Sequence, residues 1–214
     1  MKFYQSPFSS WLLGAVPGAV SRLPVTGKTL YLTFDDGPHP DTTPALVGLL
    51  NAHGATATHF LLGRRVQGWP DGVQHLLENG QHIGNHGWDH SDAWQQGVLG
   101  FRDEIRSAKR TAKLLRQFTA AHSLWYRPPY GHLHPLAARR LNQQFKIALW
   151  SIMPGDFDPQ IAARDVVRLT LQQAAPGKIL VLHDSPTAWP CLQEALPSIL
   201  KKLTERGYSL RHLP

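Results

Sequence analysis

The sequence is poor in cysteine and lacks any long hydrophobic run. Cys191 is its one cysteine, which excludes an intramolecular disulfide and gives no sign of an oxidising compartment. The apolar stretch 11–20 is short, is interrupted by Gly14, Pro17 and Gly18, and is preceded by a single Lys. It therefore makes a poor signal peptide and cannot span a bilayer. We expect a cytoplasmic protein without a transmembrane segment, with peripheral membrane contact through this stretch as the alternative.

Interdomain linkers and internal repeats are also lacking. No stretch is long, polar and free of apolar periodicity, and the 18 Gly and 17 Pro are scattered as turn residues. Charged residues make up only 17% and hydrophobic residues 42% of the 214 positions, as is typical of globular proteins. We predict a monomer with one main domain over residues 28–214, preceded by an N-terminal extension, residues 1–27, that packs on it.

Acidic residues are outnumbered, since 22 Lys and Arg against 15 Asp and Glu give a net charge of +7. This charge favours polyanions such as nucleic acid, anionic lipid or acidic cell-wall polymers, without choosing between them. The densest basic run lies in residues 100–118 among apolar residues at helical spacing, which predicts an amphipathic surface helix. Its basic face is either a solvated surface or a docking stripe for an anionic partner. The basic residues of this run are Arg102, Arg106, Lys109, Arg110, Lys113 and Arg116.

Short apolar runs alternate with amphipathic helical patterns along the chain, which is typical of βα units around a parallel sheet. The pattern predicts an α/β fold, an irregular (β/α) barrel of about seven parallel strands, with an open doubly wound sheet as the alternative. The predicted strands are 29–34, 55–62, 81–85, 125–127, 145–152, 179–182 and 208–213. The predicted helices are 44–52, 73–78, 100–118, 135–143, 162–174 and 191–206.

Chemically capable side chains stand at the ends of these predicted strands. The carboxyl ends of parallel strands gather on one face, where active sites are built. We therefore expect residues far apart in the sequence to converge there. They are Asp35, Asp36, His86, Arg127, Asp156 and His183.

Residues 33–38 read Thr-Phe-Asp-Asp-Gly-Pro, so two carboxylates end an apolar strand that a Gly-Pro pair then turns away. Adjacent strand residues point in opposite directions, which lets Asp35 and Asp36 take different tasks. One can bind a metal while the other faces the reacting water. An Asx turn or helix cap is the alternative, but it leaves the second carboxylate unexplained.

Residues 86–90 read His-Gly-Trp-Asp-His, which places two imidazoles four positions apart in a loop after a strand. Imidazole nitrogens with a carboxylate oxygen suit one divalent metal, zinc first, with cobalt or nickel as alternatives. Three protein ligands leave open positions for water and substrate, as in catalytic sites. Solvent exposure without a metal is the alternative for such a pair. To the other histidines considered we assign no function: His53, His59, His75, His82, His122, His132 and His134.

Five motifs resemble, in order, those of the polysaccharide deacetylases, a family of carbohydrate esterases that includes chitin, peptidoglycan N-acetylglucosamine and acetylxylan deacetylases. The first two motifs are TFDDGP and HGWDH, followed by RPPYG at 127–131. The fourth matches loosely as WSIMPGDF at 150–157, and the fifth is ILVLHD at 179–184. The resemblance covers the chain from about residue 28 to its C-terminus, and each motif lies at a predicted strand end.

The resemblance implies hydrolysis of the N-acetyl group of an amino sugar, such as N-acetylglucosamine in an oligo- or polysaccharide. Asp36, His86 and His90 are the implied metal ligands, and Asp35 is the implied general base. A divalent cation polarises the acetamide carbonyl and lowers the pKa of water, so that a carboxylate can deprotonate it near neutral pH. No partnership with nucleic acid is expected, since phosphoester hydrolysis would need a second metal site.

The resemblance also implies residues that assist the departure of the amine. His183 is the implied general acid, and the backbone N–H of Tyr130 is the implied donor to the oxyanion. A carboxylate partner such as Asp156 would hold His183 charged and oriented. Arg127 would brace Asp35 and keep it ionised beside the second carboxylate.

Several positions depart from the family pattern. Gly87 stands where a Ser or Thr usually ties the loop together, which predicts weaker metal binding or a looser loop. Met153 and Phe157 occupy the places of an aspartate and a tryptophan in the fourth motif, which leaves Asp156 as the acidic residue, with Asp158 as the fallback. We expect these departures to change the substrate more than the reaction.

Groove residues decide the substrate, and the sequence leaves them open. Val181 replaces a usual leucine in the pocket for the acetyl methyl, a loss of about one CH₂ of apolar contact. Four tryptophans could stack on sugar rings or pack in the core: Trp88, Trp94, Trp125 and Trp189. The alternative functions are hydrolysis of O-acetyl esters and non-catalytic binding of a sugar or metal on the same scaffold.

Overall fold

Parallel strands form one curled sheet in the residues that the computed structural model describes, which are 18–95, 100–120 and 124–214. The strand order is β1-β6-β5-β4-β3-β2-β7, with β8 beside β2, and all these strand pairs are parallel. The strands are β1 (Ala19–Val20), β2 (Thr29–Asp35), β3 (Thr58–Leu61), β4 (His82–Asn85), β5 (Leu124–Tyr126), β6 (Phe145–Ala148), β7 (Ile179–His183) and β8 (Ser209–Arg211).

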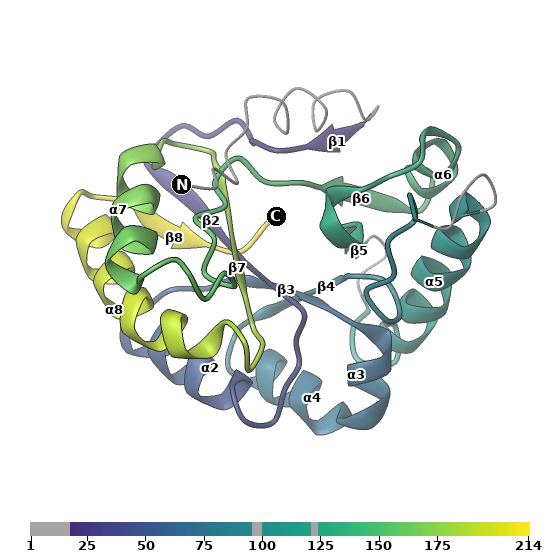
Figure 1. The fold of residues 1–214 in the computed structure, drawn as a ribbon, viewed down its shortest axis with the longest axis horizontal. Helices are drawn as coiled ribbons and strands as arrows, with labels where there is room; N and C mark the ends of the chain where they lie inside the picture. Colours follow the sequence, from purple (N-terminus) through teal and green to yellow (C-terminus); the bar gives the residue numbers. More distant parts are fainter. Residues whose placement is uncertain (1–17, 96–99, 121–123) are drawn as a thin grey trace.

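Helices follow the strands and cover the outside of the curl (Figure 1). Their apolar faces pack on the outward side chains of the sheet, as the alternation of strand and helix patterns predicts. The helices are α2 (Thr43–Ala52), α3 (Gly63–Gly68), α4 (Pro70–Glu78), α5 (Gly100–Leu115), α6 (Pro135–Leu141), α7 (Ala163–Gln173) and α8 (Trp189–Glu205). A short 3-10 turn, Pro129–Gly131, follows β5.

The sheet closes on itself irregularly. After β6 the chain crosses to β7, where Ile152 and Leu180 form an isolated parallel bridge. A second bridge joins Arg22, after β1, to Lys178, before β7. The predicted irregular (β/α) barrel is confirmed, and the alternative of an open doubly wound sheet is wrong.

Strand periodicity decides which side chains point into the barrel. In β2, Leu30, Leu32 and Phe34 belong to the core under the helices α2 and α8. Tyr31 instead packs in an interior cluster with Phe60, Trp125, Ala148, Ile179 and Leu213, which come from other strands and the C-terminus. Because side chains alternate along a strand, Thr33 and Asp35 face the interior as Tyr31 does.

The structure corrects several predicted boundaries. The strand predicted at 145–152 ends at Ala148, because the next residues leave the sheet edge and cross toward β7. The strand predicted at 55–62 is shortened to Thr58–Leu61. The sequence pattern missed β1, which has 2 residues, and α3, which has 6 and carries a glycine at each end. Elements this short give almost no periodic signal.

The predicted N-terminal extension is described only in part. Residues 1–17 lie outside the described residues, and β1, within residues 18–27, pairs with β6. Among the described helices, none has the length and apolar character needed to cross a membrane.

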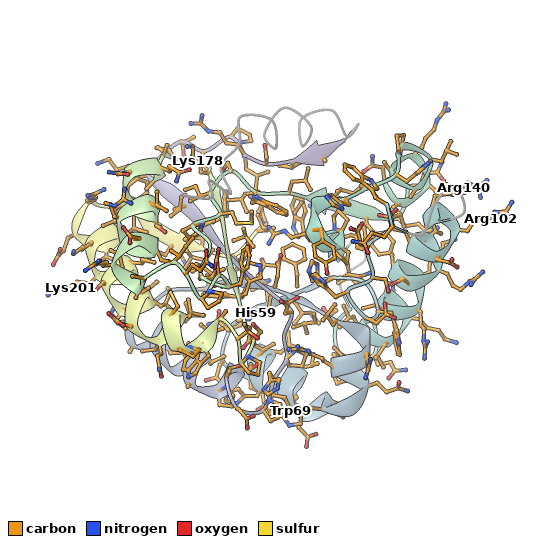
Figure 2. The ribbon with its side chains drawn as sticks, in the orientation of Figure 1. His59, Trp69, Arg102, Arg140, Lys178 and Lys201 are labelled. Carbon is orange, nitrogen blue, oxygen red and sulfur yellow. The ribbon has the colours of Figure 1, made fainter. Side chains whose placement is uncertain are left out.

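The basic run predicted on a surface helix lies on α5 and, with Arg116, one residue beyond it. Ala108, Ala112 and Leu115 are buried, whereas the six basic residues of the run are exposed. Figure 2 shows Arg102 pointing away from the barrel. Arg106 forms an ion pair with Asp103 on the same helix, at 2.9 Å. Docking of an anionic partner on this face stays a prediction.

Candidate active site

Four of the candidate residues converge inside the barrel because each continues the inward side of a strand. Three of them lie two or four positions beyond a residue of the interior cluster. The fourth, His86, lies two positions after Gly84, where a side chain would collide with the interior ring of Phe60. The four are Asp35, His86, Arg127 and His183.

Asp35 and Arg127 form a buried ion pair at the end of β2. The Arg127 Nη1 donates to Asp35 Oδ1 at 2.7 Å and to the Thr33 hydroxyl at 2.8 Å. Its Nε and Nη2 donate to the carbonyls of Ala148 and Leu149, and the arginine is fully buried. Burial lowers the pKa of Arg127, and the charge and hydrogen bond of Asp35 oppose that shift. The guanidinium therefore holds a charged carboxylate in one orientation.

Asp36, His86 and His90 bring three ligand atoms together. One carboxylate oxygen and two imidazole nitrogens lie within 4.8 Å of one another. The Asp36 Oδ1 is 3.8 Å from His86 Nε2 and 3.5 Å from His90 Nε2. One oxygen and two nitrogens at this spacing match the ligand types that zinc prefers.

Two of these three ligand atoms are buried without a hydrogen-bond partner, namely Asp36 Oδ1 and His86 Nε2. Such orphaned atoms cost free energy unless a ligand satisfies them. The other ring nitrogen of His86, Nδ1, lies 2.8 Å from the carbonyl of Arg127. It therefore carries the proton and leaves the Nε2 lone pair for a metal. Burial lowers the pKa of His86 to about 3, so the imidazole is neutral at pH 7. The donor set fits a divalent cation.

The backbone is strained at this site. Among the described residues, the non-glycine residues with positive φ are Asp36, His90 and Tyr130, at 78°, 61° and 58°. Side chains rarely adopt this conformation, and such residues cluster at functional sites. Two of the three belong to the candidate metal-ligand group and the third lines the same cavity.

The loop at Gly87, which lacks the usual hydroxyl, is hydrogen-bonded by neighbouring residues that the sequence did not reveal. The Asn85 side chain accepts the Gly87 N–H at 2.9 Å, and the Thr111 hydroxyl donates to the Gly87 carbonyl at 2.8 Å. The Ser107 hydroxyl accepts the Trp88 N–H at 2.6 Å. α5 and β4 therefore supply hydrogen bonds to the loop from outside, and the looser loop stays a prediction. The effect on metal affinity stays a prediction.

His183 is held by Asp156, as the sequence proposed. The Asp156 carboxylate lies 3.0 Å from His183 Nδ1 and accepts the His183 backbone N–H at 2.7 Å. Burial alone lowers the pKa of His183, but the charge and hydrogen bond of Asp156, with the charges of Asp36 and Asp35, raise it to about 9. His183 is therefore an imidazolium at pH 7. Phe157 packs its ring edgewise against it, with ring centroids 4.7 Å apart.

The His183 pKa gives a testable prediction. In the metal-free protein, NMR titration of the imidazole should give a pKa of about 9. Because this lies above the usual value of 6.5, the pair stabilises the fold fully below pH 6.5, and the contribution is lost as the pH rises through 9. Asp156→Asn should lower the pKa, whereas the neighbouring Asp158→Asn should leave it unchanged. A wild-type pKa near 6.5 would contradict the assignment.

A cavity of about 540 Å³ contains both the ligand set and His183. Its apolar lining residues are Val181, Met153, Phe157 and Trp150, and Tyr130, which is 55% exposed, also lines it. Four further lining residues had no assigned role in the sequence: Arg65, His132, Ser185 and Thr187. No spacing signal marks them, because α3 and the loops after β5 and β7 carry them to the cavity.

The four candidate tryptophans separate by environment. Trp125 is in the interior cluster, and Trp189 packs against the core under α8. Trp88 has the guanidinium of Arg110 over its ring at 3.3 Å. Trp94 is 50% exposed and stacks on His132, with ring centroids 3.9 Å apart. It is the tryptophan best suited to meet a sugar ring.

The chain is similar to characterised enzymes over most of its length. The model of the family described as polysaccharide deacetylase matches residues 22–148. The peptidoglycan-N-acetylmuramic acid deacetylase PdaC of Bacillus subtilis is 31% identical over 86% of this chain, and the match spans only 37% of that protein. A chitooligosaccharide deacetylase of Azorhizobium caulinodans is 28% identical over 94% of this chain and its own full length. The solved structure of the Bc1960 peptidoglycan N-acetylglucosamine deacetylase, 26% identical, superposes with a TM-score of 0.84 over 98% of this chain and 95% of that one.

Proposed function

Because the chain belongs to the polysaccharide deacetylase family, we propose that it removes N-acetyl groups from an amino sugar, N-acetylglucosamine first, within an oligo- or polysaccharide. The observation that carries this proposal is the pair of buried, unpartnered ligand atoms, Asp36 Oδ1 and His86 Nε2, beside the carboxylate of Asp35. Buried polar atoms in a structural core are usually hydrogen-bonded, whereas a metal centre uses unpartnered oxygen and nitrogen atoms as ligands.

Asp36, His86 and His90 would hold one divalent cation, zinc first, with cobalt or nickel as alternatives. When bound, the cation supplies Lewis-acid polarisation of the acetyl carbonyl and lowers the pKa of water. The neutral state of His86 keeps its Nε2 ready for binding without loss of a proton at neutral pH.

Asp35 would act as the general base. Its Oδ1 is taken by Arg127, while its Oδ2 faces the ligand set, 3.8 Å from His86 Nε2. A carboxylate that Arg127 holds in that position can take the proton from water as the water attacks the acetyl carbon. Arg127 is a positioning residue in this scheme, since it acts through Asp35.

His183 would act as the general acid. Its imidazolium, held by Asp156, gives a proton to the amide nitrogen as the carbon–nitrogen bond breaks, so that the sugar amine leaves uncharged. The backbone N–H of Tyr130, at the edge of the same cavity, would donate to the oxyanion that forms after attack. Acetate and the free amino sugar are the products.

The function is tested by incubating the purified chain, loaded with zinc, with N-acetylglucosamine oligomers of increasing length and with an O-acetylated sugar. We expect acetate release and a new amine on the N-acetylated oligomers, measured by mass spectrometry. Faster release from the O-acetyl sugar would make the chain an ester hydrolase. No release from any substrate by the folded, zinc-loaded protein would favour the alternative of a non-catalytic binding protein.

The monomeric state and the cytoplasmic location stay predictions.

A further inference from the structure

Arg65 is the arginine that the proposed chemistry leaves unused. It is half-buried on α3 and lines the catalytic cavity, as the only Arg or Lys among the described lining residues. Its Nη1 is buried and has no hydrogen-bond partner. A guanidinium keeps its charge at any physiological pH, and a buried charged donor without a partner costs free energy. A ligand that enters the cavity could satisfy it.

The backbone of α3 fixes where this arginine stands. The N–H groups of Gly63 and Arg64 donate to the carbonyls of Gly87 and Trp88, at 2.9 Å each. A side chain at Gly63 would collide with Trp88 and Thr111. The first turn of α3 is therefore docked on the loop that carries His86 and His90. This rigid attachment sets Arg65 beside the ligand set.

No acidic side chain in the described part of the chain neutralises Arg65 through an ion pair. The charge of Arg65 acts to lower the pKa of Asp184, but the two residues form no ion pair. Both carboxylate oxygens of Asp184 instead accept hydrogen bonds from the hydroxyls of Thr42 and Thr43. Asp35 is paired with Arg127, and Asp36 belongs to the ligand set. The guanidinium is thus a positive charge available to whatever fills the cavity.

We propose that Arg65 binds a carboxylate carried by the glycan, on the sugar that is deacetylated or on the adjoining one. This inference rests on the proposed function and narrows its substrate class to acidic amino-sugar glycans, such as those in which a sugar carries a lactyl ether. The planar guanidinium pairs with a carboxylate through two parallel hydrogen bonds. Neutral chitin oligomers carry no carboxylate and cannot form this pair. The acetate product is the other source of a carboxylate in this cavity.

The test compares an oligosaccharide that contains N-acetylmuramic acid with an N-acetylglucosamine oligomer of equal length. The wild-type ratio of kcat/KM, acidic over neutral, should fall about tenfold or more in Arg65→Gln. Arg65→Lys should keep part of the preference, because it retains the charge without the planar fork. Arg64→Gln is the matched control, since Arg64 is the exposed neighbour on the same helix, and it should leave the ratio unchanged.

Two further arms separate the outcomes. Conversion of the lactyl carboxylate to its neutral amide should remove the wild-type preference. If Arg65→Gln changes inhibition by acetate but not the substrate ratio, the arginine binds the product and the proposal is wrong. NMR titration of metal-free protein with the acidic and neutral oligomers reads binding directly. If binding favours the acidic oligomer and depends on Arg65 while no deacetylation occurs, the proposed activity is wrong and the Arg65 site is supported. Equal binding of the acidic and the neutral oligomer would overturn the proposed Arg65 site.

Discussion

Asp35→Asn is expected to lower kcat for acetate release by about 10²- to 10⁴-fold, the usual contribution of a general base. The asparagine has the same shape and can still accept from Arg127, but it cannot take a proton from water. The proposed metal ligands are untouched, so zinc binding should persist. Acetate release and zinc binding by calorimetry, measured on the same preparation, check both statements.

The same substitution also removes one partner of a buried ion pair, which destabilises a fold by about 3–5 kcal/mol when the other charge is left unpaired. Thermal unfolding separates this effect from the chemistry. The double variant Asp35→Asn/Arg127→Met should recover part of the stability and none of the activity. Asp41→Asn, at an exposed aspartate in the loop after β2, should change neither the stability nor the activity. Wild-type activity in Asp35→Asn would show that Asp35 is not the general base.

Removal of the metal by a chelator should abolish acetate release, and zinc should restore it in the wild type but not in His86→Ala. Loss of His86 removes one of the three proposed ligands, and the other two would hold a divalent cation poorly. Zinc at about 100 times its dissociation constant should stabilise the wild-type fold by about 2.7 kcal/mol. For a domain of this size, that corresponds to a rise in Tm of roughly 5–11 °C.

Calorimetry and thermal unfolding of His86→Ala should show neither tight binding nor the rise in Tm. His53→Ala, near the end of α2 and outside the ligand set, is the matched control and should respond to zinc as the wild type does. Undiminished activity after exhaustive chelation would show that Asp36, His86 and His90 do not hold a catalytic metal. An unchanged rise in Tm with zinc in His86→Ala would show that the metal binds at a different site.

The relation of sequence to site is clearest at β2. The alternation of apolar residues from Leu30 to Phe34 predicted the strand, and the structure places Asp35 on its inward side. The motif predicted that Asp36 would take a different direction from Asp35. Its positive φ, which turns the carboxylate toward the two imidazoles, is a property of the folded loop.

Gly87 shows the limit of a prediction made from local sequence. From the sequence, the absent hydroxyl predicted a looser loop, because the residues that replace it are distant in the chain. Ser107 and Thr111 lie on α5, and their hydroxyls reach the loop only when that helix packs beside α3 and β4. Helical periodicity located α5 but could not say which polar residue on it faces the loop.

The sequence by itself determined the α/β barrel and the strand ends that carry the reactive groups, because periodicity and motif spacing are local properties of the chain. Tertiary structure alone decided which atoms meet. The burial that neutralises His86, the carboxylate that charges His183 and the cavity position of Arg65 all depend on neighbours distant in the chain. Electrostatic and hydrogen-bond energies act through space over a few ångströms, and only the closed barrel sets those distances.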